Sequence, residues 1–437
     1  MNSKQYIPNV FHGKWRIPER DEFTLQFSGY HSYNHQECMG TLYYNENKPL
    51  KLEVYNEPKQ GLISNMYHHY DIIWGKDANG YEFTLFNANM NIPGLKDQTF
   101  DVSKEEYIID YVLLGHHVES IDEAVFDICI VKFPFLKNWA FQDNRLENRN
   151  GNLLSCEVDL DKGQPFLETE IEAGIKIALL PYSEYIPGRY DISIVQNTYL
   201  RITTDKPIST RRFMQLIFEY SQFLSLALFS NQSPIKIELR TRKEPRRWSF
   251  LLYEIESSEK PYEIPLIKYD KLREKLPSML SVWHSNFEQL SPIINYLIRS
   301  LQHKRFFEAP DFLIIAQALD GYYKRFVNKK DGKDIKQYKC QITKLLEHFK
   351  DIYLLQECGI DVEELTQSRH KYSHLIPDND EKIEKAVIGE DLYNLTQKCI
   401  VLLTCCILDN IGLTIEEINI CFHDSAIQQI VDTLPLI

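Results

Sequence analysis

The hydrophobic pattern of the last third of the chain constrains the fold most strongly. From about Met279, apolar residues recur at helical spacing, and Pro292, Pro310 and a turn region over residues 328–334 are expected to separate the helical stretches. Helices joined by short loops are expected to pack as an antiparallel bundle. The predicted helices cover residues 312–326, 335–349, 362–376, 383–410 and a last stretch from 415, with 400–407 buried in the core.

A different pattern governs the chain up to about residue 200. Tyr and Phe are frequent there, and turns with Gly, Asn, Asp and Pro recur. The turn Asp77-Ala78-Asn79-Gly80 separates two aromatic-rich runs, residues 70–74 and 81–86, which predicts a β-hairpin. We expect Trp15 and Trp74 to pack in the core of the resulting sheet.

The middle of the chain mixes both patterns. Residues 210–229 have one broad apolar helical face, whereas residues 235–239 and 248–255 resemble short strands. The fold class is therefore α+β. We predict a β-rich N-terminal domain over 1–200, a mixed connecting region over 201–300 and an all-α helical domain over 301–437.

Composition excludes several classes of protein. The 437-residue chain has nine cysteines without a CxxC pair, which argues against a disulfide framework and suits the reducing cytosol. The N-terminus lacks the pattern of a secretion signal, and the apolar runs are too short to span a bilayer, so we predict a cytoplasmic protein without a membrane partner.

The formal charge of −13 argues against a general nucleic-acid coat protein, but it allows a local basic groove. Two basic stretches, residues 240–247 and 324–339, could supply such a groove or could simply be solvated surface.

One short segment carries the chemistry. In Arg369-His370-Lys371-Tyr372-Ser373-His374, an arginine and a histidine lie five positions apart in a predicted helix. A guanidinium can hold a phosphate through two parallel hydrogen bonds, and an imidazole can transfer protons near neutral pH. Arg369 lies on or beside the apolar stripe of Leu365 and Tyr372, so we expect it to be partly packed and to need a partner.

Two alternatives compete for the same residues. His370 and His374 are one helical turn apart and could bind zinc, although the segment has no acidic third ligand at a recognised spacing. Arg369 and the histidines could also be ordinary residues of a solvated helix face. Other catalytic motifs are missing from the sequence, namely GxxxxGK[ST], GxGxxG, GxSxG and HExxH.

The Arg369, His370 and His374 pattern, late in a helical domain, resembles the signature of HEPN ribonucleases. At the other end of the chain, residues 11–18, Gly40-Thr41-Leu42 and the hairpin ending in Thr84-Leu85 resemble the N-terminal domain of ApeA-like phage-defence proteins. Proteins of that family carry a C-terminal HEPN nuclease. In this chain the N-terminal motifs precede the C-terminal signature, as they do in that family, so the two resemblances support each other.

The resemblance implies roles for particular residues. His374 would be the general acid/base, Arg369 the phosphate stabiliser and His370 an orienting residue, with Asp320 as the acid that HEPN domains tend to carry near the motif. We also predict RNA contacts for Lys371, Tyr372, Lys324 and Arg325.

The chain is thus expected to be a metal-independent HEPN endoribonuclease in antiviral defence, which needs no cofactor. Its expected partners are RNA, with tRNA as a candidate, a second or further copy through the helical domain, and a phage-derived trigger. The alternative is a non-catalytic regulator that binds RNA or protein with a HEPN-like bundle.

Overall fold

In the computed structural model, the chain folds into two compact units. The first unit holds Met1–Phe133, Leu200–Leu216 and Ser233–Ser257, and the second holds Pro134–Tyr199, Ile217–Gln232 and Ser258–Ile437. The structure describes residues 9–18, 35–45, 48–56, 69–97, 102–140, 146–149, 153–156, 165–187, 192–244, 247–254, 258–302, 309–328, 335–377 and 381–434.

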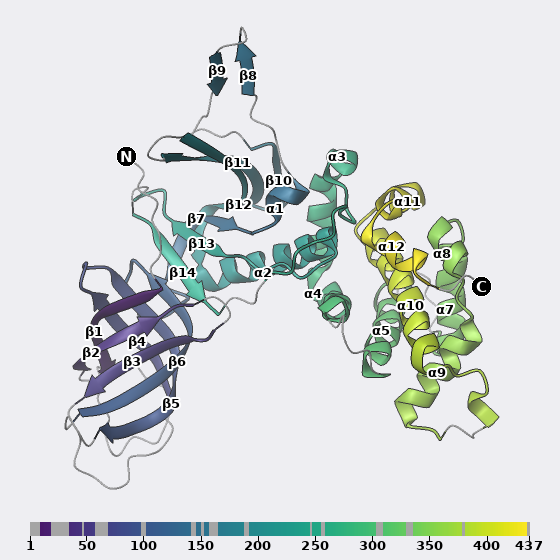
Figure 1. Cartoon of the computed structure of the whole chain (residues 1–437), viewed down its shortest axis with the longest axis horizontal. Helices are drawn as coiled ribbons and strands as arrows, with labels where there is room; N and C mark the ends of the chain where they lie inside the picture. The colour runs from purple at the N-terminus through teal and green to yellow at the C-terminus, as the bar shows by residue number, and fades with distance from the viewer. Residues whose placement is uncertain are drawn as a thin grey trace. The chain divides into compact units, whose positions relative to one another are not determined.

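Six antiparallel strands of the first unit close into a barrel (Figure 1). The pairings run from β6 through β3, β2, β1, β4 and β5 and return from β5 to β6. The strands are β1 (Val10–Pro18), β2 (His35–Tyr43), β3 (Leu50–Asn56), β4 (His69–Asp77), β5 (Glu82–Asp97) and β6 (Val102–Leu114). The predicted β-rich N-terminal region is confirmed, and closure leaves none of these six strands as a free edge.

The barrel interior is built on alternation along each strand. Buried and exposed residues alternate along β1, and its Trp15 is fully buried with its ring 5.6 Å from that of Phe83. Trp15 lies directly against Gly75, where an added Cβ would come within 2.1 Å of the indole. Trp74 was expected in the same core, but its side chain points to the other face of β4, because neighbouring strand residues alternate.

The predicted hairpin is present between β4 and β5. The Asp77 carboxylate accepts hydrogen bonds from the backbone of Asn79 at 2.9 Å and of Tyr81 at 2.8 Å. Gly80 takes the positive φ of 87° that the turn requires.

Three further strands continue the sheet beyond the barrel. They are β7 (Val125–Lys132), β13 (Lys236–Arg240) and β14 (Ser249–Tyr253). Strand β14 pairs with the end of β6, and β13 lies between β14 and β7. The two strands predicted in the connecting region are therefore present, and they pair with strands of the first unit.

The second unit combines a smaller set of strands with nearly all of the helices. Helix α2, predicted over residues 210–229, is confirmed as Thr210–Leu228 and is shared by both units. The strands are β8 (Leu146–Arg149), β9 (Leu153–Cys156), β10 (Leu167–Glu172), β11 (Ile175–Pro187) and β12 (Ile192–Ser209), of which β12 also enters the first unit.

The C-terminal helices form the predicted bundle around α10, whose residues 399–408 are all buried. Besides α2, the described helical elements of the second unit are α1 (Leu136–Trp139), α3 (Tyr269–Leu272), α4 (Leu276–Gln302), α5 (Ala309–Tyr322), η1 (Tyr323–Val327), α7 (Tyr338–His348), α8 (Tyr353–Cys358), α9 (Val362–His374), η2 (Glu381–Ile383), α10 (Gly389–Asn410), α11 (Ile415–Phe422) and α12 (Ala426–Asp432).

Several helix boundaries differ from the prediction. Helix α4 continues through Pro292, because buried apolar residues on both sides of the proline offset the lost backbone hydrogen bond. The stretch 384–388, after the short 3-10 helix η2, is not helical, and α10 begins only at Gly389. The last helix is split in two, since Asp424 adopts a positive φ of 56°.

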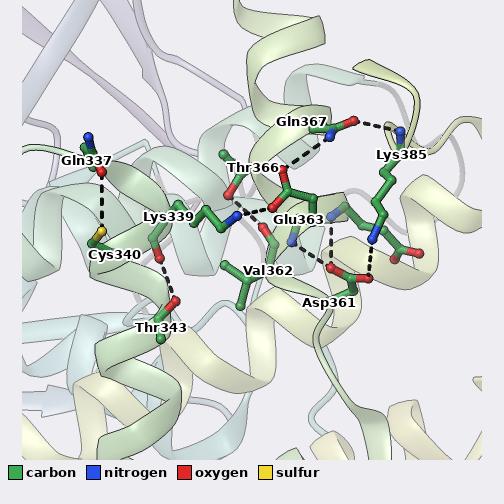
Figure 2. A network of polar contacts seen from close by, with 11 residues as sticks. Gln337, Lys339, Cys340, Thr343, Asp361, Val362, Glu363, Thr366, Gln367 and Lys385 are labelled. Carbon is green, nitrogen blue, oxygen red and sulfur yellow. Dashed lines mark hydrogen bonds and ion pairs between the residues drawn. The ribbon is translucent and has the colours of Figure 1, made fainter. Parts of the chain in front are cut away.

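Helix α9 begins with a side-chain cap and is tied to its neighbours (Figure 2). The Asp361 carboxylate accepts hydrogen bonds from the backbone of Glu363 at 2.7 Å and of Glu364 at 3.2 Å. Glu363 pairs with Lys339 of α7, and Gln367 accepts a hydrogen bond from the backbone of Lys385 at 2.7 Å. These contacts fix α9 against α7 and against the segment before α10.

Replacing Gly75 by Ala is expected to destabilise the barrel by about 1–3 kcal/mol, because the new methyl group collides with the buried indole of Trp15. Urea unfolding followed by tryptophan fluorescence would measure this loss. The matched control is Lys76→Ala on the exposed face of the same strand, which should change the free energy of unfolding by less than about 0.5 kcal/mol. Equal losses in both variants would contradict the packing argument.

Replacing Asp361 by Ala is expected to lower the stability of the helical bundle by about 1 kcal/mol at neutral pH. Burial acts to raise the pKa of Asp361, but its backbone hydrogen bonds and Lys385 outweigh that effect and bring this pKa below its usual value. The contribution is therefore complete above the unfolded pKa of about 4 and is lost as the pH falls through the lower folded pKa.

Urea unfolding of wild type and Asp361→Ala, followed by circular dichroism between about pH 7 and pH 2, would show the two curves converging at low pH. Asp361→Asn keeps an oxygen acceptor and should lose less than the Ala variant. A stability gap that stays constant over the whole pH range would show that the charge of the carboxylate does not contribute.

Candidate active site around Arg369

Three elements position Arg369. Its own helix α9 packs against α5 and α7, and the guanidinium lies between them. One terminal nitrogen donates to Asp320 on α5 at 3.2 Å, and the guanidinium carbon lies 4.4 Å from the ring centre of Tyr338 on α7. The side chain keeps 32% of its surface exposed. The partly packed position expected for Arg369 is thus observed.

The Asp320 carboxylate accepts hydrogen bonds from two cations, Arg369 and Lys324. Lys324, one turn later, contacts the same Oδ2 atom at 2.9 Å, and the Asp320 side chain is only 13% exposed. Asp320 lies in the last turn of α5, which ends at Tyr322 and continues as a π-helical turn over Tyr323–Val327. Among the described residues, Asp320 is the one hydrogen-bond partner of Arg369, so most of the five guanidinium N–H donors stay open to a ligand.

The two histidines of the motif lie on the exposed side of α9. The ring centres of His370 and His374 are 5.0 Å apart, with the ring planes inclined at 64°. His374 is the last residue of the helix. Each imidazole is therefore accessible to a substrate.

One copy of the helix does not bring His374 to the guanidinium. Five residues on an α-helix correspond to about 140° of rotation and about 7.5 Å of rise. Arg369 accordingly faces α5 and α7, whereas His374 is exposed at the end of the helix, and among the described residues no hydrogen bond or ring contact joins the two side chains. The structure brings together Arg369, Asp320 and Lys324, but not His374.

The remaining predicted RNA contacts are placed differently. Lys371 is buried, with 7% of its surface exposed, which leaves little of it for contact with RNA. The Tyr372 hydroxyl donates to the carbonyl of Val387 at 3.0 Å, and its ring packs edge-on against Phe312. Arg325 donates to the backbone carbonyl of Gln289 on α4 at 2.5 Å. Only Lys324 of these four lies beside Arg369, and all four roles stay predictions.

The end of α9 has an unusual conformation. Leu375 follows His374 with φ 52° and ψ 44°, in the left-handed region that normally favours glycine. Its side chain is 87% exposed, so packing does not compensate the backbone strain. Backbone strain of this kind is common at functional sites, where the surrounding structure or a ligand holds the strained conformation in place.

Among the residues that the structure describes, no group of three or more His, Cys, Asp and Glu side chains is arranged to hold a metal ion. Helix α10 is long and apolar enough to cross a membrane, but 78% of its most apolar 18-residue stretch is buried inside the protein. Core helices of bundles have the same composition, so α10 is weak evidence for a membrane span.

The structure describes part of each basic stretch, residues 240–247 and 324–339. The guanidinium of Arg240 stacks on the ring of Trp248 in the first unit, and Lys339 pairs with Glu363. Lys329, Lys330 and Lys333 lie outside the described residues.

Sequence reasoning missed Tyr338. It lies far from Arg369 in the chain and belongs to another helix, so no spacing rule connects the two residues. The only signal was a bulky aromatic residue near the start of a predicted helix.

Comparison with known families is consistent with this arrangement. Residues 10–283 match the model of ApeA N-terminal domain 1, and residues 313–417 match that of the Apea-like HEPN domain. No curated protein and no solved structure matches the chain. HEPN domains are generally of the ribonuclease type, and the family supports a role in antiviral defence. The second match contains Asp320, Arg369 and His374. The chain therefore belongs to the ApeA family and carries a C-terminal HEPN domain.

Proposed function

We propose that the protein is a metal-independent HEPN endoribonuclease that acts in antiviral defence. The arrangement of Arg369 carries this proposal, because its guanidinium is anchored by Asp320 and Tyr338 yet keeps 32% of the side chain exposed. A fixed, permanently charged group with open donors suits a phosphodiester that gains charge in the transition state. Two exposed imidazoles on the same helix supply groups that can transfer protons near neutral pH.

The proposed reaction starts with the ribose 2′-hydroxyl. Its proton passes to an imidazole nitrogen of His374 while the 2′-oxygen bonds to the adjacent phosphorus and the bond to the 5′-oxygen breaks. The 5′-oxygen leaves with a proton from a motif imidazole, and the other product ends in a 2′,3′-cyclic phosphate. Arg369 stabilises the phosphate, His370 orients the imidazole of His374, and Lys324 contacts a neighbouring phosphate.

The separation of Arg369 from His374 favours a site made by two copies of the chain. Since the two side chains face different directions on one helix, a second copy could place its own histidine near the first copy's arginine. Apolar surface is present beside the end of α9, where Leu375 is 87% and Ile388 is 59% exposed. Burial of these side chains between two copies would stabilise the pair.

The N-terminal barrel unit has the proposed task of sensing a trigger or restraining the nuclease. A phage-derived molecule is the proposed trigger, tRNA is the candidate substrate, and the cytoplasm is the proposed location. Control of this kind is required because an unrestrained ribonuclease would damage the RNA of its own cell.

Replacing His374 by Ala is expected to slow RNA cleavage by about two to four orders of magnitude, because proton transfer is lost. The exposed position of His374 at a helix end should keep folding and RNA binding close to those of wild type. Purified protein would be incubated with total cellular RNA in excess chelator, and the cut ends would be mapped for 2′,3′-cyclic phosphates.

His423→Ala is the matched control, since this exposed histidine of the same bundle has no proposed role and should leave cleavage unchanged. Cleavage by His374→Ala at the wild-type rate would overturn the assignment. RNA binding without cleavage by the wild type, with or without extract from infected cells, would favour the non-catalytic regulator instead.

Replacing Leu375 by Asp is expected to weaken pairing by about tenfold or more, because a charge would be buried in the proposed contact. Sedimentation velocity and specific activity over a dilution series would measure the effect. Leu375→Gly should weaken pairing too, although glycine relieves about 1–2 kcal/mol of left-handed strain and should raise the melting temperature of a single copy.

Ile420→Asp on α11 is the control, since its side chain is 43% exposed and has no part in the proposed contact. Full specific activity in a strictly monomeric preparation would rule out the site made by two copies.

A further inference from the structure

Tyr338 contacts the guanidinium of Arg369, although the sequence did not predict this contact. It is the first residue of α7, it is 8% exposed, and its ring centre lies 4.4 Å from the guanidinium carbon. We propose that Tyr338 is a positioning residue, whose ring holds the guanidinium of Arg369 in the orientation that binds the scissile phosphate. This proposal rests on the proposed function and adds a residue to it.

Asp320 alone does not fix the guanidinium. It contacts one terminal nitrogen of Arg369 at 3.2 Å, and a single hydrogen bond still allows the group to rotate about that contact. Asp320 is also shared, because Lys324 contacts the same oxygen at 2.9 Å. A second restraint is therefore needed if the open N–H groups are to face a substrate in one orientation.

The aromatic ring provides that restraint. A guanidinium within about 6 Å of a ring centre is attracted by the negative face of the ring, and the attraction grows when water is excluded. The ring is almost fully buried at the contact between α7 and α9, so it cannot move away with its cation. Together the carboxylate and the ring would hold the guanidinium at two points.

The ring, rather than the hydroxyl, is the part of Tyr338 that this arrangement uses. The buried hydroxyl has no hydrogen-bond partner among the described residues. Burial raises its pKa well above the usual value, so the group stays neutral and does not exchange protons during the reaction. A buried, unpaired hydroxyl normally reduces stability, which means that its removal should not harm the fold.

The experiment compares Tyr338→Phe, which keeps the ring, with Tyr338→Leu, which removes it. Tyr338→Phe should cleave RNA within about twofold of the wild-type rate and should melt at an equal or higher temperature. Tyr338→Leu should lower kcat by about tenfold or more at saturating RNA, while KM changes less, because the aligned guanidinium contributes mainly in the transition state.

Phe349→Leu is the matched control for lost packing. Phe349 is a buried aromatic residue at the other end of α7, and its described ring contact is with His348. If Phe349→Leu lowers kcat as much as Tyr338→Leu at a similar melting temperature, general destabilisation explains the loss and the positioning role is overturned.

A second measurement does not depend on cleavage. In protein labelled at arginine, the ring current of Tyr338 should shift the side-chain resonances of Arg369, which are assigned with Arg369→Lys. We expect this shift to persist in Tyr338→Phe and to vanish in Tyr338→Leu. An unshifted Arg369 in the wild type would overturn the proposal.

The two measurements separate the failure of this inference from that of the proposed function. A shifted Arg369 in a protein that cleaves no RNA would reject the nuclease and keep the contact as a structural one, which removes the positioning role. A wild type that cleaves RNA, together with an equally active Tyr338→Leu, would keep the nuclease and reject the role of Tyr338.

Discussion

A partly buried cation organises the C-terminal bundle. About two thirds of the Arg369 side chain is covered, and a charge in that position must have a partner, because desolvation of an unpaired guanidinium is costly. Asp320 supplies the opposite charge from α5, and Tyr338 supplies a polarisable face from α7. The relative placement of α5, α7 and α9 must satisfy this one group, and the cap at Asp361 and the contacts of Gln367 hold α9 in register with it.

Much of the fold could be predicted from hydrophobic periodicity and turn chemistry. The hairpin at Asp77–Gly80, helix α2, strands β13 and β14 and the buried middle of α10 all follow from local patterns. Periodicity failed where tertiary contacts decide the outcome. Helix α4 runs through Pro292 because its neighbours are buried. Residues 384–388 form a turn and a short irregular stretch instead of helix, because Ser368 and Tyr372 bind the backbone of Val387.

In the candidate site, too, local pattern and family resemblance predicted some features, whereas others depend on tertiary contacts. The partial burial of Arg369 could be inferred from its place beside Leu365 and Tyr372, and family resemblance suggested the nearness of Asp320. The burial of Lys371 and the diversion of Arg325 to Gln289 depend on which helices meet, and no pattern within α9 or η1 encodes that. The contact of the Tyr338 ring with Arg369 is of this kind, so the sequence alone could not predict it.

The π-helical turn at Tyr323–Val327 has a consequence for changes in chain length. A π turn holds one residue more than an α turn, so the chain could lose one residue there and become regular helix without a break. Because Asp320 precedes the turn and the extra residue is absorbed within it, such a deletion would leave the carboxylate beside Arg369 and would change the directions only of side chains in the turn, Lys324 and Arg325 among them. A single-residue deletion there would thus redirect the cations around the site while preserving its central ion pair.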